Sequence, residues 1–334
     1  MKKKIMHILN TNDYSGAENV AITIIRAMQN EMEGVYVSLS GPIKEYLDEY
    51  GITYYPVRKL SIMSVRKAIR DIDPDIIHAH DFTAGIECAL TGTHIPIVNH
   101  IHNNSPWLRR YNLKSFVYAI SCHKYRKVLT VSDSVMDEYV FGNRFKNKTE
   151  VIGNPIDTDK IRNLAGHPDI IYDVAFLGRF SIPKNPHMFL DIIKELKENK
   201  SDIKAVMIGD GDLRTEIEQR IRENGLTDNI TLTGFQKNPY IYLNQAKLLC
   251  MPSIWEGYGL AAVEALALGK PVVCSKAGGL PTIVDDSCGK LCEKKEEYLD
   301  YILKMIGGQN DLLCASRAAI EKADRIDNLE SYTR

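Results

Sequence analysis

Long apolar runs are missing from this sequence of 334 residues, and no stretch approaches the roughly 20 apolar residues that a membrane-spanning helix needs. Met1 to Lys4 is basic, but the apolar run behind it is short and is interrupted by His7, Asn10 and Asn12. This pattern argues against a secretory signal peptide. We therefore expect a protein that is made and kept in the cytoplasm.

Paired cysteines are missing as well. The seven cysteines are scattered and odd in number, with no Cys-x-x-Cys pair and no histidine at zinc-ligand spacing. Cys288 and Cys292 lie close together, but their spacing is a poor metal signal. Most of the seven should be small buried hydrophobic residues. We therefore expect no disulfide framework, no structural metal and no cofactor.

Acidic residues are missing between Glu87 and Asp133, although the net charge of the chain is only −1. The small net charge argues against general nucleic-acid binding. Within the gap, residues 107–127 mix cations with apolar and aromatic residues: Trp107, Leu108, Arg109, Arg110, Tyr111, Lys114, Phe116, Val117, Tyr118, Lys124, Tyr125, Arg126 and Lys127. Such a segment suits a peripheral contact with an anionic bilayer, here the inner face of the plasma membrane, or with a lipid pyrophosphate. The alternative is a core-packing helix with a solvated basic face.

The chain is too long for one ordinary core and fits two domains. Strand-like runs alternate with helical segments, which is typical of α/β proteins with parallel, doubly wound sheets. The expected strands are 5–9, 35–39, 54–57, 75–79, 96–100 and 128–131, followed by 172–177, 205–208, 230–232, 248–251 and 272–274. A linker at 164–170, which contains Gly166 and Pro168, predicts Rossmann-like domains over 1–165 and 166–334. Ligands of such sheets bind beyond the carboxyl ends of the strands.

Two carboxylates, Glu256 and Glu264, stand on either side of a glycine-bearing turn in the segment Met251–Ser275. The turn opens a predicted helix over 260–268, which Gly269 ends. Backbone N–H groups at the start of this helix would face a bound anion. Because carboxylates repel phosphate, the two glutamates are better explained as acceptors for hydroxyls that flank a diphosphate. A solvated face is the ordinary alternative for such a pair.

Two cations follow the expected strand 172–177. Arg179 and Lys184 lie five residues apart in a loop in which Gly178 allows close approach and Pro183 limits the freedom of the chain. A nucleotide diphosphate needs cations from a metal or from the protein, and these two residues are the natural suppliers. In isolation, two surface cations in a loop would be the simpler interpretation.

A family resemblance joins these motifs. The pattern of Glu256, seven residues and Glu264, with Gly-Tyr-Gly-Leu inside it and Gly-Lys-Pro-Val-Val after it, resembles the retaining glycosyltransferases of the GT-B fold, family 4. The resemblance extends over nearly the whole chain. Four more motifs match in the expected order: Ser15-Gly16-Ala17-Glu18, Pro96-Ile97-Val98-Asn99-His100-Ile101-His102, Gly178-Arg179-Phe180 with Lys184, and Gly209-Asp210-Gly211.

The resemblance implies two Rossmann-like domains that face a central cleft, the N-terminal one for the acceptor and the C-terminal one for the nucleotide sugar. It implies that Arg179 and Lys184 hold the donor phosphates without a divalent ion, and that His102 contacts the donor sugar near its reacting carbon. Glu256 would orient the sugar hydroxyls and Glu264 the ribose. The donor-binding residues that it implies are Gly16, Gly178, Gly209, Phe235, Gly257, Tyr258, Gly259, Leu260 and Glu264.

Some of these residues have structural alternatives. His100 would point the same way as His102 along a strand and confounds its assignment. The turns at Gly209 and at Gly234-Phe235 are as consistent with plain structural turns as with nucleotide binding. Short acidic pairs such as those at Asp73, Asp157 and Asp210 are interpreted as connections and helix caps, with Asp210 to Asp212 capping the helix from Leu213, and not as metal sites.

The chain departs from the family pattern at three places. Thr282 stands where the Gly-Gly-x-Pro motif of the family is often followed by Glu, which puts in doubt a supporting contact from that position. Asn154-Pro155-Ile156-Asp157 stands where the family often has Asn-Gly-Ile/Val-Asp, which we expect to alter the hinge and not the chemistry. The chain also ends soon after Tyr332, so we expect the closing helix that commonly crosses back to the first domain to be short or absent.

These features predict a retaining, metal-independent hexosyltransferase. It would move a sugar from a nucleotide sugar, with a UDP-sugar favoured, to a glycan or polyprenyl-linked acceptor in capsule, cell-wall or exopolysaccharide synthesis. The transition state would be oxocarbenium-like, and the diphosphate leaving group would carry much of the catalysis. The alternatives are a nucleotide-sugar epimerase of the same fold, a phosphorylase, and a non-catalytic nucleotide-sugar-binding partner of another transferase.

Overall fold

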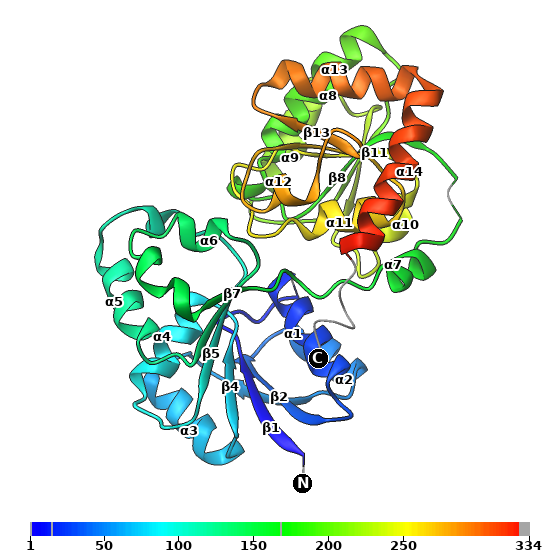
Figure 1. Ribbon diagram of the computed structural model, residues 1–334. Coiled ribbons are helices and arrows are strands. Elements are labelled where there is room, and N and C mark those ends of the chain that lie inside the picture. Colours follow the sequence, from blue (N-terminus) through cyan, green and yellow to red (C-terminus); the bar gives the residue numbers. More distant parts are fainter. Residues whose placement is uncertain (1, 15, 168, 327–334) are drawn as a thin grey trace. The chain divides into compact units, whose positions relative to one another are not determined.

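The computed structural model describes residues 2–14, 16–167 and 169–326 (Figure 1). The chain forms two compact units, the first ending at Pro155 and the second beginning at Ile156. Sequence analysis drew the boundary after residue 165, whereas in the structure helix α7 (Thr158–Ala165) packs against α10 (Tyr240–Asn244) and α11 (Leu260–Ala267) of the second unit. Residues 327–334, on which the expected closing helix depends, lie outside the described residues.

A seven-stranded parallel sheet forms the first unit, in the order β3-β2-β1-β4-β5-β6-β7. Its strands are β1 (Lys3–Ile8), β2 (Met32–Leu39), β3 (Thr53–Val57), β4 (Ile76–Ala79), β5 (Ile97–Ile101), β6 (Lys127–Thr130) and β7 (Thr149–Val151). Its helices are α1 (Gly16–Ala27), α2 (Ile43–Glu49), α3 (Ile62–Ile72), α4 (Phe82–Leu90), α5 (Leu113–Cys122) and α6 (Ser134–Asp137), with 3₁₀ turns at Pro106–Arg109 and Gly142–Lys148. Figure 1 shows α3, α4 and α5 on one side of this sheet and α1 and α2 on the other.

A six-stranded parallel sheet forms the second unit, in the order β10-β9-β8-β11-β12-β13. Its strands are β8 (Tyr172–Leu177), β9 (Ala205–Ile208), β10 (Ile230–Gly234), β11 (Ala246–Met251), β12 (Val272–Ser275) and β13 (Gly289–Cys292). Besides α7, α10 and α11, its helices are α8 (Pro186–Asn199), α9 (Arg214–Glu223), α12 (Leu280–Ile283), α13 (Lys295–Gly307) and α14 (Gln309–Ile326), with a 3₁₀ turn at Ile182–Lys184.

Burial explains why the strands have continuous apolar runs. Every residue of β9 is buried, as are the last four of β11, because helices cover both faces of a parallel sheet. The strand order 3-2-1-4-5-6 recurs in both units and reverses between β1 and β4 and between β8 and β11. Two doubly wound, Rossmann-like units are therefore confirmed, and the reversal points are where such sheets bind ligands.

Helix α14 closes the core of the second unit. Its buried stripe consists of Ala315, Ala319 and Ala323, and the small side chains allow close packing on α11. Arg162 joins α7 to both helices, because its Nε donates to the carbonyl of Ala267 at 3.0 Å and its Nη2 pairs with Asp324 at 2.5 Å. The position of α11 thus depends on the last described helix.

Candidate active site

Backbone hydrogen bonds join the loops at the carboxyl edge of the second sheet. Phe180 N donates to Asp210 O at 2.8 Å, which ties the loops after β8 and β9. Ile254 N donates to Pro183 O at 2.8 Å and so ties the loops after β8 and β11. Gly279 N donates to Gly257 O at 3.0 Å, which ties the loop after β12 to the loop after β11. The predicted site residues of the second unit lie in the loops at this edge or on α11.

An ion pair joins two of the predicted catalytic residues. Lys184 Nζ lies 2.5 Å from Glu256 Oε1, although the two residues stand 72 positions apart in the sequence. Ser253 Oγ donates to the same carboxylate oxygen at 3.0 Å. Glu256 is 6% exposed and Lys184 28% exposed. The carboxylate is thus held in one orientation, while the ammonium group remains accessible from the edge of the sheet.

Arg179 differs from Lys184 in having no charged partner among the described residues. Its side chain is exposed, and it makes no ion pair with any residue that the structure describes. It follows Gly178, which packs directly on Gly209: a Cβ built on Gly209 would lie 2.1 Å from Gly178 O, and the φ of Gly209 is 139°. Glycine at position 209 is therefore needed to bring the ends of β8 and β9 together next to the loop that carries Arg179.

The carboxyl group of Glu264, on α11, has a pKa that its surroundings raise. Burial raises the pKa of its carboxyl to about 7, and the raising is opposed by a hydrogen bond from Tyr240 and by the charge of Lys184. Tyr240 Oη donates to Glu264 Oε1 at 3.2 Å. Gly259 precedes the helix with a φ of 103°, and a Cβ there would lie 2.7 Å from Leu280 Cδ2. A carboxyl and the open N-terminus of a helix thus stand within one turn of each other.

The remaining predicted donor-binding residues occupy different environments. Phe235 follows β10 and is 52% exposed. Tyr258 is partly buried, which raises the pKa of its phenol to about 12, and Leu260 packs against the apolar core. Gly257 is buried in the loop beside Glu256.

Sequence analysis missed several residues that shape this edge. Gly278 has a φ of 54°, and a Cβ there would lie 1.8 Å from Glu256 O, so this glycine lets the loop after β12 close on the loop that carries Glu256. Ser253 and Tyr240, which bond the two glutamates, were also not anticipated. Gly278 belongs to a Gly-Gly-x-Pro motif, which was the one available signal for it.

The acidic pairs at Asp73 and Asp157 lie at helix ends, as predicted, whereas the predicted helix cap at Asp210 to Asp212 is not formed. Asp157 caps α7 by accepting from Lys160 N at 2.8 Å, and Asp73 ends α3 with a φ of 51°. The prediction that Asp210 to Asp212 cap the next helix is wrong, because α9 begins at Arg214 without a side-chain cap and Asp210 accepts from Gly211 N within its own turn.

In the first unit, His102 lies directly after β5 and belongs to a cluster of imidazoles. We call His7, His78, His80, His100 and His102 the histidine cluster. Hydrogen bonds link three members, with 3.0 Å between His7 Nδ1 and His80 Nε2 and 3.1 Å between His80 Nδ1 and His102 Nε2. Burial lowers the pKa of all five rings, that of His102 to about 4 and that of His7 to about 3. The cluster is therefore neutral at pH 7.

Strand register explains the histidine cluster. His7 of β1 pairs with His78 of β4, and alternate residues of a strand share a face, so His80 follows on that face. The same alternation keeps His100 and His102 together, which confirms their expected common direction, with 4.1 Å between their ring centroids. Two His-x-His repeats at the ends of consecutive expected strands were the signal in the sequence.

Gly16 opens α1 and is exposed, while Ser15 lies outside the described residues. The buried Glu18 accepts a hydrogen bond from Thr11 Oγ1. Tyr14 Oη donates to Asn19 Oδ1 at 2.7 Å. The side chains that follow Gly16 are thus bound to the loop before the helix, and the amide end of α1 is left facing outward.

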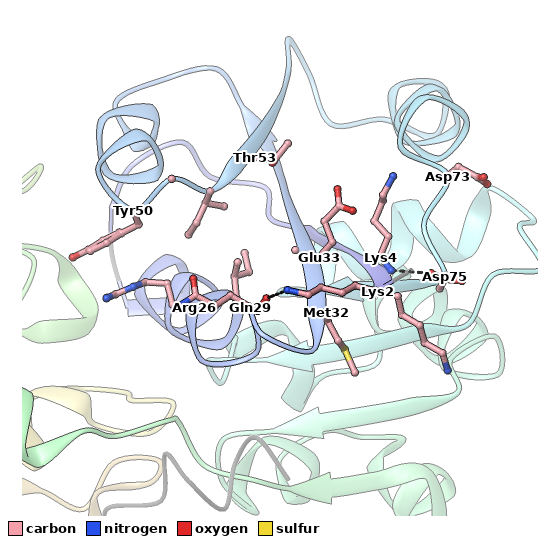
Figure 2. Close-up of a pocket in the computed structure, with 15 residues that line it drawn as sticks. Lys2, Lys4, Arg26, Gln29, Met32, Glu33, Tyr50, Thr53, Asp73 and Asp75 are labelled. Carbon is pink, nitrogen blue, oxygen red and sulfur yellow. Dashed lines mark hydrogen bonds between the residues drawn. The ribbon is translucent and has the colours of Figure 1, made fainter.

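A hollow of about 730 Å³ lies at the opposite edge of the first sheet (Figure 2). It is lined at the amino ends of the strands by residues such as Lys2, Lys4, Arg26 and Glu33. Figure 2 shows Lys2 reaching the carbonyl of Gln29, at 2.8 Å. Lys4 Nζ is bonded to Ile72 O at 3.0 Å. Lys2 and Lys4 are thus bonded to backbone carbonyls, Arg26 lies over the ring of Tyr50, and this edge is not the one at which Rossmann-like sheets bind ligands.

Comparisons with known proteins agree with this arrangement. Residues 157–325 match the family described as Glycosyl transferases group 1, and residues 14–160 match the family described as Glycosyltransferase Family 4. This chain belongs to the glycosyl transferases group 1. The transferase has the GT-B fold that the resemblance implied, with both Rossmann-like units present.

Relatives of the transferase cover most of its length. It is 24% identical over 345 residues to the UDP-Gal:alpha-D-GlcNAc-diphosphoundecaprenol alpha-1,3-galactosyltransferase of Escherichia coli, a match that covers 91% of this chain and 84% of that protein. An uncharacterized glycosyltransferase of Methanocaldococcus jannaschii is 25% identical over 238 residues, which cover 63% of this chain and 57% of that protein. The crystal structure of Anabaena HepE in complex with UDP and glucose superposes with a TM-score of 0.86 at 21% identity, over 99% of this chain and 97% of that one.

No helix in the described part of the transferase could span a membrane. Each helix there is too short or too polar to cross a bilayer. Six of the seven cysteines are buried, as expected for small hydrophobic residues, and Cys314 is exposed.

Proposed function

We propose that this glycosyltransferase moves a hexose from a UDP-sugar to a lipid-linked glycan, with retention of configuration and without a divalent ion. The observation that carries the proposal is the Lys184–Glu256 ion pair at the reversal point between β8 and β11, in the same loop as Arg179, which makes no ion pair with a described residue. This arrangement provides cations for a diphosphate and a buried acceptor for a sugar hydroxyl in one place.

The two cations have complementary roles in holding the diphosphate. The guanidinium group of Arg179 makes no ion pair with a described residue, and a guanidinium group can bind phosphate oxygens in a bidentate manner. Lys184 is held by Glu256 until an anion competes for its ammonium group. The start of α11 adds backbone N–H groups near Gly259. Together these groups would stabilise the charge that develops on the leaving diphosphate, which is the work that a divalent ion does in other transferases.

The two glutamates would orient the donor. When Lys184 turns toward phosphate, Glu256 Oε1 loses the ammonium group but keeps the hydrogen bond from Ser253, so the carboxylate stays in place and can accept a hydrogen bond from a sugar hydroxyl. Glu264 would accept from the ribose. Neither glutamate is proposed as a nucleophile. The departing phosphate oxygen would take the acceptor's proton on the face that it leaves, which gives retention. The roles of His102 and Gly16 remain predictions.

The identities of donor and acceptor rest on relatives. The Escherichia coli relative is named for a UDP-sugar and for a diphosphoundecaprenol acceptor, and the Anabaena structure holds UDP and glucose. Their identities to this chain are 24% and 21%, which is why UDP and a polyprenyl-linked glycan of capsule, cell-wall or exopolysaccharide synthesis enter as proposals.

The outer face of α5 supports a peripheral contact with a membrane. Its exposed apolar side chains repeat at helical spacing and follow an exposed tyrosine: Tyr111, Leu113, Phe116 and Ile120, which are 50–79% exposed. Exposed cations without an ion pair among the described residues lie within or next to this segment of the sequence: Arg110, Lys114, Lys124 and Arg126. Arg109 and Lys127 are instead paired with Glu138 and Glu150. We call this the α5 surface, and its apolar ridge with a basic border fits an anionic lipid surface.

A thermal-shift panel of nucleotide sugars, followed by transfer assays with the best stabiliser, tests the proposal. Arg179→Ala should leave the melting temperature of the free protein unchanged and remove most of the stabilisation by UDP. Arg222→Ala, which removes another exposed arginine that makes no ion pair with a described residue, is the control. Equal stabilisation by UDP in both variants would contradict the phosphate role. Conversion of a UDP-sugar to an isomer without any acceptor would favour an epimerase instead.

A further inference from the structure

Three members of the histidine cluster converge outside the diphosphate site of the second unit. We propose that His80, His100 and His102 form a binding site for a divalent transition-metal cation of the zinc class, and that occupancy of this site immobilises His102. The proposal goes beyond transfer itself, because it assigns a ligand to the first unit that the proposed reaction does not require.

The distances suit a small cation. One nitrogen from each of His80, His100 and His102 can be chosen so that all three lie within 4.8 Å of one another. His80 Nδ1 and His102 Nε2 are 3.1 Å apart. Two ligands on a tetrahedral zinc ion, each about 2.0–2.1 Å from the metal, stand roughly 3.3 Å apart. The first two ligand atoms therefore need to separate by only a small amount to admit the ion.

The third ligand is available. His100 is fully buried, and neither of its ring nitrogens has a hydrogen-bond partner among the described residues. A neutral imidazole has one donor and one acceptor, and leaving both unsatisfied inside a protein is costly. Turning one nitrogen of His100 toward a cation breaks no hydrogen bond and satisfies the lone pair.

The hydrogen bonds around the site allow one consistent set of protons. A metal at His80 Nδ1 requires the proton of that ring to be on Nε2, where His7 Nδ1 accepts it at 3.0 Å. A metal at His102 Nε2 likewise places the proton of that ring on Nδ1, which has no hydrogen-bond partner among the described residues. His80 therefore has the partner that fixes its tautomer, as is usual for zinc-bound histidines, whereas His102 would be fixed by the metal itself.

The ligand type selects the class of cation. The group consists of imidazoles alone, which favour zinc, copper, nickel and cobalt over magnesium and calcium, whose preferred ligands are oxygens. His102 is partly exposed, whereas His80 and His100 are buried. The ion would therefore enter from the side of His102 and would keep a fourth position there for water.

Titration of the full chain with metal alone tests the site, without donor or acceptor. The protein is stripped with a chelator and titrated with ZnCl₂, and separately with CoCl₂, whose visible absorption reports four-coordinate geometry. We expect one equivalent to bind, the melting temperature to rise with zinc concentration, and a tetrahedral cobalt spectrum to appear. His100→Leu should weaken binding at least tenfold, while His94→Leu, which removes an exposed histidine, should change nothing.

Several outcomes would overturn the proposal. They are the absence of any shift or cobalt spectrum in the wild type, wild-type affinity in folded His100→Leu, and loss of binding in His78→Leu with retention in His100→Leu, which would place the ion at His7, His78 and His80. If His100→Leu does not fold, the wild-type cobalt spectrum decides, and an octahedral spectrum rejects the site. Because no nucleotide sugar is present, failure here is distinct from failure of the proposed transfer reaction.

Discussion

Lys184 and Glu256 hold each other in the described structure, with 2.5 Å between the ammonium nitrogen and a carboxylate oxygen that is largely removed from solvent. The pair gives a buried carboxylate its counter-charge and fixes the position of the ammonium group. Under the proposed function, an incoming diphosphate would compete with the carboxylate for Lys184, so binding of the phosphates would coincide with release of Glu256 toward a sugar hydroxyl.

Breaking this pair should destabilise the protein unequally. Lys184→Met leaves a carboxylate that is 6% exposed without its partner and should lower the free energy of unfolding by about 2–3 kcal/mol. Glu256→Gln should cost about 1 kcal/mol, because Lys184 can turn to solvent. The double variant should lose less than the sum of the two, as measured by urea unfolding, and all three should lack transfer activity. Additive losses would show that the two groups are not coupled.

Gly278→Ala should disturb the loop that carries Glu256. Its Cβ would lie 1.8 Å from Glu256 O at a φ of 54°, so the loop must move. We expect a loss of about 2–4 kcal/mol in the free energy of unfolding and at least tenfold weaker UDP binding by calorimetry. Gly225→Ala is a matched control, because its φ is 63° and no atom lies within 4 Å of the added carbon. It should show only the smaller cost of backbone strain and unchanged UDP binding, and equal effects in both variants would refute the close contact.

Glu264→Gln should stabilise the protein in a pH-dependent way. Burial raises the pKa of this carboxyl from 4.5 to about 7 in the folded chain, so the folded state favours the neutral acid. Its contribution to stability is present below about pH 4.5 and is lost as the pH rises through 7. Relative to wild type, the variant should gain about 2 kcal/mol at pH 8 and nothing near pH 4.5, by chemical unfolding at each pH. Glu198→Gln, at an exposed carboxyl, should show no such trend, and a flat profile for Glu264→Gln would contradict the raised pKa.

The α5 surface should bind anionic vesicles. Co-sedimentation with vesicles that contain phosphatidylglycerol should exceed that with phosphatidylcholine alone and should fall with salt, because the lysines and arginines supply part of the attraction. Phe116→Ser with Ile120→Ser should reduce binding several-fold without changing the melting temperature, since both side chains already face solvent. Met63→Ser on α3, at a residue that is 80% exposed, is the control. Equal binding by all three proteins would rule out this surface.

Features that depend on a single strand or a single loop could be predicted from the sequence. Apolar runs such as 172–177 and 205–208 predicted strands within a residue of their bounds. Strands β7 and β13 were not predicted, because Thr149–Val151 and Gly289–Cys292 are short and have little apolar pattern. The glutamate and cation motifs were found individually. Their pairing was not, since Lys184 meets Glu256 only because β8 and β11 are neighbours, and strand order depends on how the whole sheet assembles.

The histidine cluster is a second case in which contacts between distant segments could not be predicted from the sequence. His7 and His80 stand 73 positions apart and meet through the pairing of β1 with β4. His102 was recognised alone, through its motif. The repeat of His-x-His at two strand ends would have predicted a cluster only together with the knowledge that β4 and β5 lie side by side with their histidines on one face.

The packing of α14 on α11 also has a consequence for the order in which the protein is built. On the ribosome, the segment that carries Glu256 and Glu264 emerges before Ala315, Ala319 and Ala323 have been synthesised, so α11 leaves the tunnel without the surface against which it packs. The nascent chain displays both glutamates but cannot yet hold them in position. The surface that holds α11 in place is therefore complete only when synthesis has reached the last described helix.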